Sequence, residues 1–91
     1  MTLTVGSITF DRVSYDREAD VLYLSVGDPA QAVDFDESAE GNALRYDADG
    51  RLVGITIVNA RDLLERDGAI VVTPPQLRVD GDELAAVLAA A

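Results

Sequence analysis

The chain has 91 residues, no cysteine, no histidine and no lysine, and seventeen acidic residues against seven arginines give a formal net charge of -10. The missing residue types exclude disulfides, thiol nucleophiles, Schiff-base lysines, catalytic triads that use histidine, and metal sites with thiolate or imidazole ligands. The charge argues against nucleic-acid binding, which needs clustered positive charge to displace counterions. A hydrophobic fraction of 48% predicts a single folded domain, residues 1–91, with a modest core.

The first ten residues lack the basic start and the apolar run of about 7–15 residues that define a signal peptide. No segment approaches the roughly 18–20 apolar residues of a membrane span. We therefore expect a cytoplasmic protein that binds no membrane, and we expect no cofactor.

The first part of the chain predicts short strands joined by turns. Residues 2–10 fit a short strand, a turn and the lead into the next strand. Residues 12–15 and 21–26 predict a hairpin, because the intervening 16–20 has the length of a hairpin loop. The second strand ends at Gly27-Asp28-Pro29, since proline cannot donate to a ladder.

The middle of the chain predicts a further strand and the clearest hairpin. Residues 31–36 alternate apolar and acidic side chains, and 37–42 reads as a polar loop. Residues 43–47 and 51–58 form the hairpin, whose turn has Gly50 available for a positive φ. Gly54 in the second strand marks either a bulge or a close approach by another element.

The last third predicts a short helix and more extended chain. Asn59 is a suitable N-cap for a helix over 60–66, and Gly68 is a suitable terminator. Residues 70–73 read as extended up to Pro74-Pro75, and 77–79 reads as a short strand.

A second short helix is predicted at the end of the sequence. Asp80 and Glu83 resemble a capping box, and Leu84, Val87 and Leu88 make an amphipathic stripe. The predicted fold class is α+β, a small antiparallel β-meander of about four strands with one or two short C-terminal helices.

Two segments, about twenty residues apart, share an acidic turn between strand-like runs. They read Tyr15-Asp16-x-Glu18-Ala19-Asp20-Val21-Leu22-Tyr23-Leu24 and Tyr46-Asp47-x-Asp49-Gly50-Arg51-Leu52-Val53-Gly54-Ile55-x-Ile57. In this order they resemble the family known as domain of unknown function 2283, over a core of about residues 13–64. Residues 1–11 and 67–91 extend beyond the family pattern, and Thr56 stands where the family often has a glutamate.

The resemblance implies a small β-rich fold with no established activity. It also implies an antitoxin-like role, because some relatives resemble gene neighbours of small basic toxin-like proteins.

The carboxylates of Asp16, Glu18 and Asp20 are candidate ligands for calcium or magnesium, since residues two apart in extended or turn backbone can project to one side. The alternative is a solvated hairpin loop, in which Asp16 caps the turn and Asp20 starts the next strand. An EF-hand loop beginning at Asp47 is excluded, because Arg51 and Val58 stand where oxygen ligands are required.

A second acidic group, Asp34, Asp36, Glu37 and Glu40, lies in a stretch without arginine. It is a candidate surface for a basic protein partner, whose association it would speed by electrostatic steering. The alternative is a charged strand edge that prevents edge-to-edge aggregation.

Residues 21–26 and 52–58 carry apolar side chains on both faces, and a chain of this length has little left to cover a second face. We therefore expect a homodimer that buries it. The tyrosines Tyr15, Tyr23 and Tyr46 are expected to be cross-strand packing residues rather than acids or ligand contacts.

These features favour a non-enzymatic protein-interaction domain, in its most concrete form an antitoxin-like inhibitor of a basic partner. The alternative is a divalent-metal-binding domain that uses the acidic turn from Asp16 to Asp20. A third reading, a hydrolase with paired carboxylates, requires an acid with a raised pKa in a cleft, and the sequence shows no sign of one.

Overall fold

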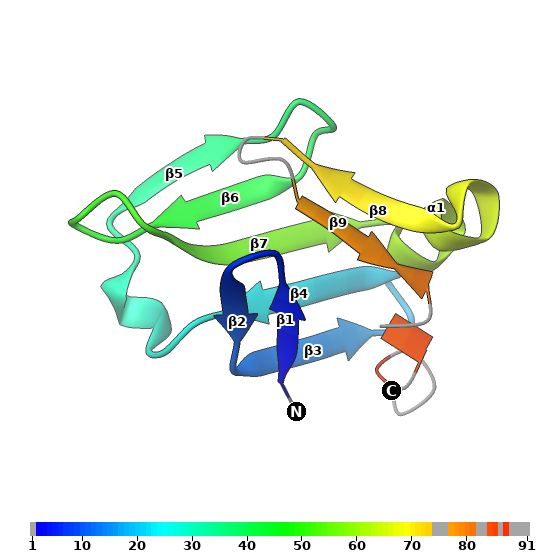
Figure 1. Ribbon diagram of the computed structural model, residues 1–91, viewed down its shortest axis with the longest axis horizontal. Coiled ribbons are helices and arrows are strands. Elements are labelled where there is room, and N and C mark those ends of the chain that lie inside the picture. Colours follow the sequence, from blue (N-terminus) through cyan, green and yellow to red (C-terminus); the bar gives the residue numbers. More distant parts are fainter. Residues whose placement is uncertain (1, 74–76, 82–83, 86, 88–91) are drawn as a thin grey trace.

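The computed structural model describes residues 2–73, 77–81, 84, 85 and 87. Its main feature is a five-stranded antiparallel sheet with the strand order β3-β4-β7-β6-β5 (Figure 1). The strands are β3 (Arg12–Asp16), β4 (Val21–Ser25), β5 (Asp34–Glu37), β6 (Ala43–Tyr46) and β7 (Leu52–Val58).

The chain does not follow a simple meander through this sheet. After the β3–β4 hairpin, the short 3-10 turn η1 (Pro29–Gln31) leads the chain to the far edge at β5. Strands β5, β6 and β7 then return, and β7 pairs with β4 in the middle of the sheet. The α+β class is confirmed, but the predicted number of about four strands was too low, because the sheet has five strands and the described chain forms two more two-stranded hairpins.

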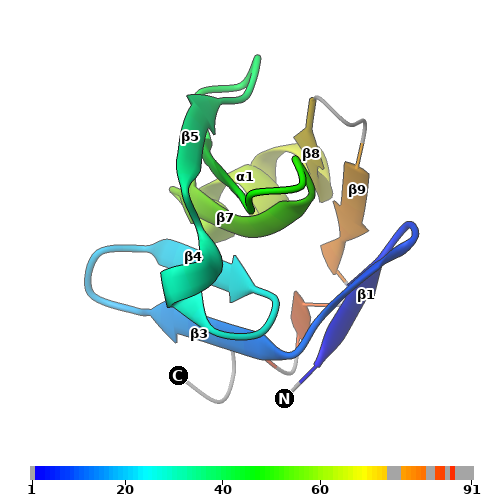
Figure 2. The same ribbon diagram turned by 90° about the vertical axis from the view of Figure 1, so that its left-hand side faces the viewer.

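Two further hairpins pack on one face of the sheet, which we call the inner face (Figure 2). They are β1 (Leu3–Val5) with β2 (Ile8–Phe10), and β8 (Ala69–Val72) with β9 (Leu77–Asp80). Between β7 and β8 lies the helix α1 (Ala60–Asp67), which ends one residue beyond the predicted 60–66. Gly68, with φ 77°, terminates it as expected and donates its N–H to the carbonyl oxygen of Leu64 at 2.8 Å.

The core lies between the inner face and these hairpins. Alternate residues of the sheet point inward and are at most 2% exposed: Leu22, Leu24, Leu44, Ile55 and Ile57. Phe10 from β2 and Val72 from β8 close over them. Burying one such side chain contributes roughly 1.5–3 kcal/mol, so these strands are held by their inner faces.

The predicted C-terminal helix falls partly outside the described residues. Gly81, Leu84, Ala85 and Val87 have helical backbone, and Leu84 and Val87 are buried. Glu83, Leu88 and the Pro74-Pro75 pair lie outside the described residues. No helix in the described part of the chain is long and apolar enough to cross a membrane.

Candidate functional site

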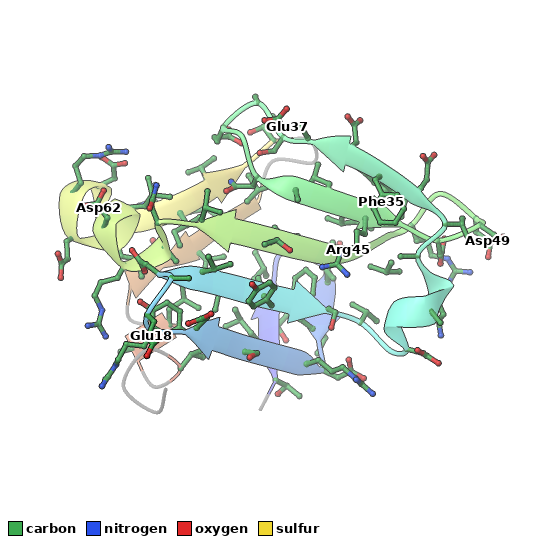
Figure 3. The ribbon with its side chains drawn as sticks, turned by 180° about the vertical axis from the view of Figure 1, so that it is seen from behind. Glu18, Phe35, Glu37, Arg45, Asp49 and Asp62 are labelled. Atoms are coloured by element: carbon green, nitrogen blue, oxygen red, sulfur yellow. The ribbon has the colours of Figure 1, made fainter. Side chains whose placement is uncertain are left out.

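The face of the sheet opposite the core, the outer face, is defined by the strand register. One row runs across all five strands as Ser14, Tyr23, Thr56, Ala43 and Glu37. A neighbouring row runs as Arg12, Ser25, Gly54, Arg45 and Phe35. The two hairpins outside the large sheet, β1–β2 and β8–β9, pack on the inner face, so among the described residues the outer face lies open (Figure 3).

Three of the large hydrophobic side chains that are exposed in the described residues lie on this side. Tyr23 is 41% exposed, Val58 48% and Phe35 69%, and all three occupy outer-face positions in the register. Val33, 62% exposed, precedes β5 and donates its N–H to the carbonyl oxygen of Tyr46 at 2.9 Å. Scattered exposed hydrophobics are normal on a protein surface, whereas a group on one sheet face indicates an interaction surface.

Arg45 lies across the middle of the outer face. A Cβ placed on Gly54 would be 3.4 Å from Cβ and 3.5 Å from Nε of Arg45, which is ordinary van der Waals contact. The guanidinium Nη2 donates to the hydroxyl oxygen of Thr56 at 3.2 Å. Of the two alternatives predicted for Gly54, a bulge or a close approach, the register shift between Arg45 and Tyr46 in the facing strand fits the bulge.

Acidic side chains lie around these exposed hydrophobic side chains and Arg45. Asp16 and Glu37 occupy outer-face positions at opposite edges of the sheet. Figure 3 shows Glu18 and Asp62 at one end of the face and Glu37 along its upper side. The outer face therefore combines exposed hydrophobic side chains, with Arg45 between them, and a negatively charged rim.

The structure places the predicted acidic group at residues 34–40 in two different surroundings, with three members on β5 and Glu40 in the turn that follows. All four residues of β5 are exposed, and this strand forms one edge of the sheet. Asp34 accepts the N–H of Phe35 at 3.0 Å, and Asp36 accepts the N–H of Glu37 at 2.8 Å. Because Ser38 donates its N–H inward to the carbonyl of Asn42, the amides of Phe35 and Glu37 point to the free side of the edge.

The carboxylates of Asp34 and Asp36 thus accept the hydrogen bonds of the two main-chain N–H groups that another strand would use for pairing. This arrangement matches the alternative interpretation, a charged edge that resists edge-to-edge pairing.

Glu40 connects the β5–β6 turn to the residue after β8. Its Oε1 accepts the N–H of Thr73 at 2.8 Å, and Ala39 donates its N–H to the carbonyl of Thr73 at 2.8 Å. These bonds tie the β5–β6 turn to the end of β8. Desolvation opposes the charge, but the hydrogen bonds from Thr73 outweigh it and lower the pKa of Glu40.

The acidic residues of the turn between β3 and β4 also bond to different parts of the fold. Asp16 Oδ1 accepts the N–H groups of Glu18 at 3.1 Å and Ala19 at 3.2 Å, and so caps its own turn. Asp20 has a left-handed φ of 56° and turns the other way, toward α1. The side chains of Asp16 and Asp20 therefore serve different groups rather than one centre.

Asp20 caps the helix α1 from 40 residues away in the sequence. Its Oδ1 accepts the N–H of Arg61 at 2.8 Å and its Oδ2 the N–H of Asp62 at 3.3 Å, while Tyr15 donates its hydroxyl to Oδ1 at 2.7 Å. Asn59 occupies the N-cap position, but its φ is 59° and its side chain makes no capping hydrogen bond. The prediction that Asn59 caps this helix was wrong in its side chain, because side-chain capping requires an extended N-cap backbone.

This environment shifts two pKa values. Burial opposes ionisation of Asp20, but the hydrogen bond from Tyr15 and the amides of Arg61 and Asp62 outweigh it and lower the pKa of this carboxyl. The same hydrogen bond to the Asp20 carboxylate, with burial, raises the pKa of Tyr15. The Arg61 guanidinium lies 5.9 Å from the centre of the Tyr15 ring.

The cation site predicted at Asp16, Glu18 and Asp20 stays a prediction. Within the described residues, no group of three or more acidic side chains is gathered so that it could hold a metal ion. In the other motif, Asp47 Oδ1 accepts the N–H groups of Asp49 and Arg51, each at 2.9 Å, as the turn interpretation predicts.

Two clefts open on the described surface. One of about 540 Å³ lies between the β1–β2 and β6–β7 turns, with Ile8, Val26 and Leu52 in its lining, and its two charged lining residues, Asp47 and Arg51, pair at 3.6 Å. The other, of about 420 Å³ beside α1, contains Arg66 and Arg78.

The arginines of the second cleft are already neutralised, Arg66 by Asp67 at 3.2 Å and Arg78 by Asp80 at 2.9 Å. The two carboxyls with shifted pKa values, Asp20 and Glu40, are shifted downward, whereas a general acid needs an upward shift.

Sequence reasoning recognised that two strands are apolar on both faces, but it missed the role of Phe35 and Val58 in the exposed surface. For Val58 the available signal was its alternation with the buried Ile57, which places it opposite the core. For Phe35 the alternation with Asp34 and Asp36 pointed the other way, because it favours the apolar side chain for the core. The cap provided by Asp20 had no signal in the sequence, since it depends on a contact between distant segments.

The family described as Protein of unknown function (DUF2283) matches residues 12–61, which is more than half of the chain, and the chain therefore belongs to that family. Comparisons with curated proteins and with solved structures give no match.

Proposed function

We propose that this member of the DUF2283 family is a non-enzymatic interaction domain that binds a basic protein through the outer face of its five-stranded sheet. In its most concrete form it is an antitoxin-like inhibitor that covers the functional surface of its partner. The observation that carries the proposal is the group of exposed hydrophobic side chains on that face, Tyr23, Phe35 and Val58, within an acidic rim.

The exposed hydrophobic side chains of the outer face provide the binding energy in this proposal. Exposed aromatic residues are the side chains that most often dominate protein interfaces, because they bury a large area at a small entropic cost. Tyr23 lies on β4, next to the central strand β7, and Phe35 lies on the edge strand β5, so a partner that contacts both spans most of the sheet.

The charge of the chain selects the partner. With a net charge of -10, the domain attracts basic proteins over a distance and repels acidic ones. Glu37 and Asp16 lie where the rim of a partner would contact the face. Such rim charges mainly raise the association rate and make binding sensitive to salt.

The test is a pull-down from the native host at low salt with three baits, followed by mass spectrometry. The baits are the wild type, Tyr23→Glu, which replaces one of the exposed hydrophobic side chains by a charge, and Ala48→Glu, which adds the same charge on the exposed β6–β7 turn. We expect one stoichiometric basic protein on the wild type and on Ala48→Glu, released by added salt and absent from Tyr23→Glu.

Equal recovery of that protein on all three baits would place its binding site elsewhere. Recovery of the bare domain alone at low salt would count against the basic partner. A second copy of the chain on the outer face would appear as self-association that Tyr23→Glu abolishes.

A further inference from the structure

We propose that two copies of this chain pair edge to edge through β3, the strand at the end of the sheet opposite β5. The result is a dimer with one continuous sheet and a two-fold axis at Ser14. The β3 edge is a different surface from the outer face that binds the basic protein in the proposed function. Pairing at this edge follows from the backbone direction and the side-chain order of its five residues, Arg12, Val13, Ser14, Tyr15 and Asp16.

The backbone of β3 presents a defined set of free groups. Val26, just after β4, donates its N–H to the carbonyl of Val53 in β7. Because the direction of the main-chain N–H and C=O groups alternates along a strand, those of the even-numbered residues of β4 point to β7 and those of the odd-numbered residues point to β3. Since Tyr23 of β4 is opposite Ser14, the main chain of Ser14 points inward to β4. The N–H and C=O groups of Val13 and Tyr15 therefore point outward at the edge.

Only a few registers let two such edges bond in antiparallel orientation. When Ser14 of one copy is opposite Ser14 of the other, Val13 is opposite Tyr15 of the second copy. Each of these residues then donates its N–H to, and accepts an N–H from, its opposite residue. Every outward main-chain group of Val13 and Tyr15 is used in this register.

The same register pairs the side chains favourably. On the outer face, Arg12 of each copy is opposite Asp16 of the other, so a cation meets an anion at both ends. On the inner face, Val13 is opposite Tyr15, which joins two half-buried apolar side chains at the margin of the core. The strand is thus complementary to itself when reversed, which an isologous contact requires.

The two ends of the strand are available for this contact. Arg12 and Asp16 are exposed, and in the part of the chain that the structure describes Arg12 makes no ion pair. Asp16 uses Oδ1 for its turn, and no described group bonds to its Oδ2. A second copy therefore gains these ion pairs without breaking bonds inside the domain.

The other edge of the sheet behaves differently. On β5 the outward amides of Phe35 and Glu37 are occupied by the carboxylates of Asp34 and Asp36. In the described residues, no side chain occupies the amides of Val13 and Tyr15 in this way. As far as the described residues show, one edge is blocked and the other is open, so pairing stops at a dimer instead of continuing into a filament.

The dimer leaves the outer face free. Because Ser14 of both copies points to the same side of the joined sheet, the two outer faces become one surface, with the two Tyr23 side chains about three strand spacings, or roughly 14 Å, apart.

The absence of cysteine permits a direct test with single cysteines. The variant Ser14→Cys places one thiol on the two-fold axis, where opposite residues of a non-hydrogen-bonded antiparallel pair have Cα atoms about 4.5 Å apart, within disulfide range. We expect mild oxidation to convert it to a covalent dimer on a non-reducing gel. The control is Ser7→Cys in the exposed β1–β2 turn, which we expect to stay monomeric under the same conditions.

Charge reversal provides an independent test by sedimentation equilibrium. Arg12→Glu and Asp16→Arg each create like-charge pairs, so each alone is expected to be monomeric, and a mixture of the two is expected to form a heterodimer with both ion pairs restored. Circular dichroism checks that each variant is folded. If the turn does not tolerate arginine, Asp16→Asn, which removes both ion pairs without adding a charge, is measured alone and is expected to weaken the dimer. A monomeric wild type, equal cross-linking of both cysteine variants, or a dimer unaffected by Arg12→Glu would overturn the proposal.

Discussion

At the scale of single residues, Asp20 connects the β3–β4 hairpin with the helix α1. Its carboxylate accepts hydrogen bonds from the Tyr15 hydroxyl and from two amides of the first turn of α1. Its backbone carbonyl also accepts the N–H of Ala60 at 3.2 Å. The hairpin β3–β4 and the helix are therefore joined through one side chain.

Asp20→Ala is expected to lower the free energy of unfolding by about 1–2 kcal/mol, because it removes the helix cap and places alanine at a positive φ. Asp20→Asn is expected to cost less, since asparagine tolerates the left-handed conformation and keeps one acceptor oxygen. Urea unfolding followed by circular dichroism measures both. Glu18→Ala, in the same turn and exposed, is the matched control and should stay within about 0.5 kcal/mol of the wild type.

The lowered pKa of Asp20 predicts a pH dependence of this contribution. A carboxyl whose pKa is lower in the folded than in the unfolded state stabilises the fold fully above its unfolded value, near 3.8 here. The stabilisation is lost as the pH falls through the lowered folded value. The stability difference between wild type and Asp20→Asn should therefore be constant at neutral pH and shrink below about pH 4. A difference that grows on acidification would contradict the assignment.

This residue also marks a limit of sequence reasoning. The segment from Tyr15 to Asp20 was readable as a hairpin turn, because turn residues and strand periodicity are local signals. That Asp20 serves the helix at residue 60 depends on β7 lying beside β4, which no local pattern contains. The sequence therefore predicted the turn and the helix correctly and assigned the cap to the neighbouring Asn59.

At the scale of elements, the two edges of the sheet show how side chains control strand pairing. Strand β5 was predicted to end at Asp36, because Glu37 begins a polar stretch. It continues to Glu37, and its two aspartates bond to the amides that follow them. Of these acidic residues only Glu37 was assigned to the loop, whereas Asp34 and Asp36 belonged to the predicted strand whose edge they occupy.

Removing these aspartates should expose the edge. The double variant Asp34→Ala/Asp36→Ala is expected to aggregate faster than the wild type, measured as light scattering during incubation just below the melting temperature. The control Glu18→Ala/Glu65→Ala removes the same charge from exposed positions outside β5 and should aggregate as slowly as the wild type. Equal acceleration in both double variants would mean that net charge, not edge blocking, keeps the protein dispersed.

At the scale of the whole molecule, one face of the sheet is covered and the other is open. The inner face is buried by two hairpins from the ends of the chain, whereas the outer face exposes Tyr23, Phe35 and Val58. The sequence indicated strands that are apolar on both sides, and from this a surface that needs a partner. It did not indicate which edge is open, because that depends on the strand order and on the register of β3.

The most direct test of the central claim is a nuclear magnetic resonance titration of the labelled domain with the basic protein that it captures. The account predicts that side-chain signals of Tyr23, Phe35 and Val58 shift together and that those of the buried Ile70 and Val72 do not. Added salt should reverse the shifts. Shifts confined to the β8–β9 hairpin or to α1, with the outer face unchanged, would contradict the claim that this face binds the partner.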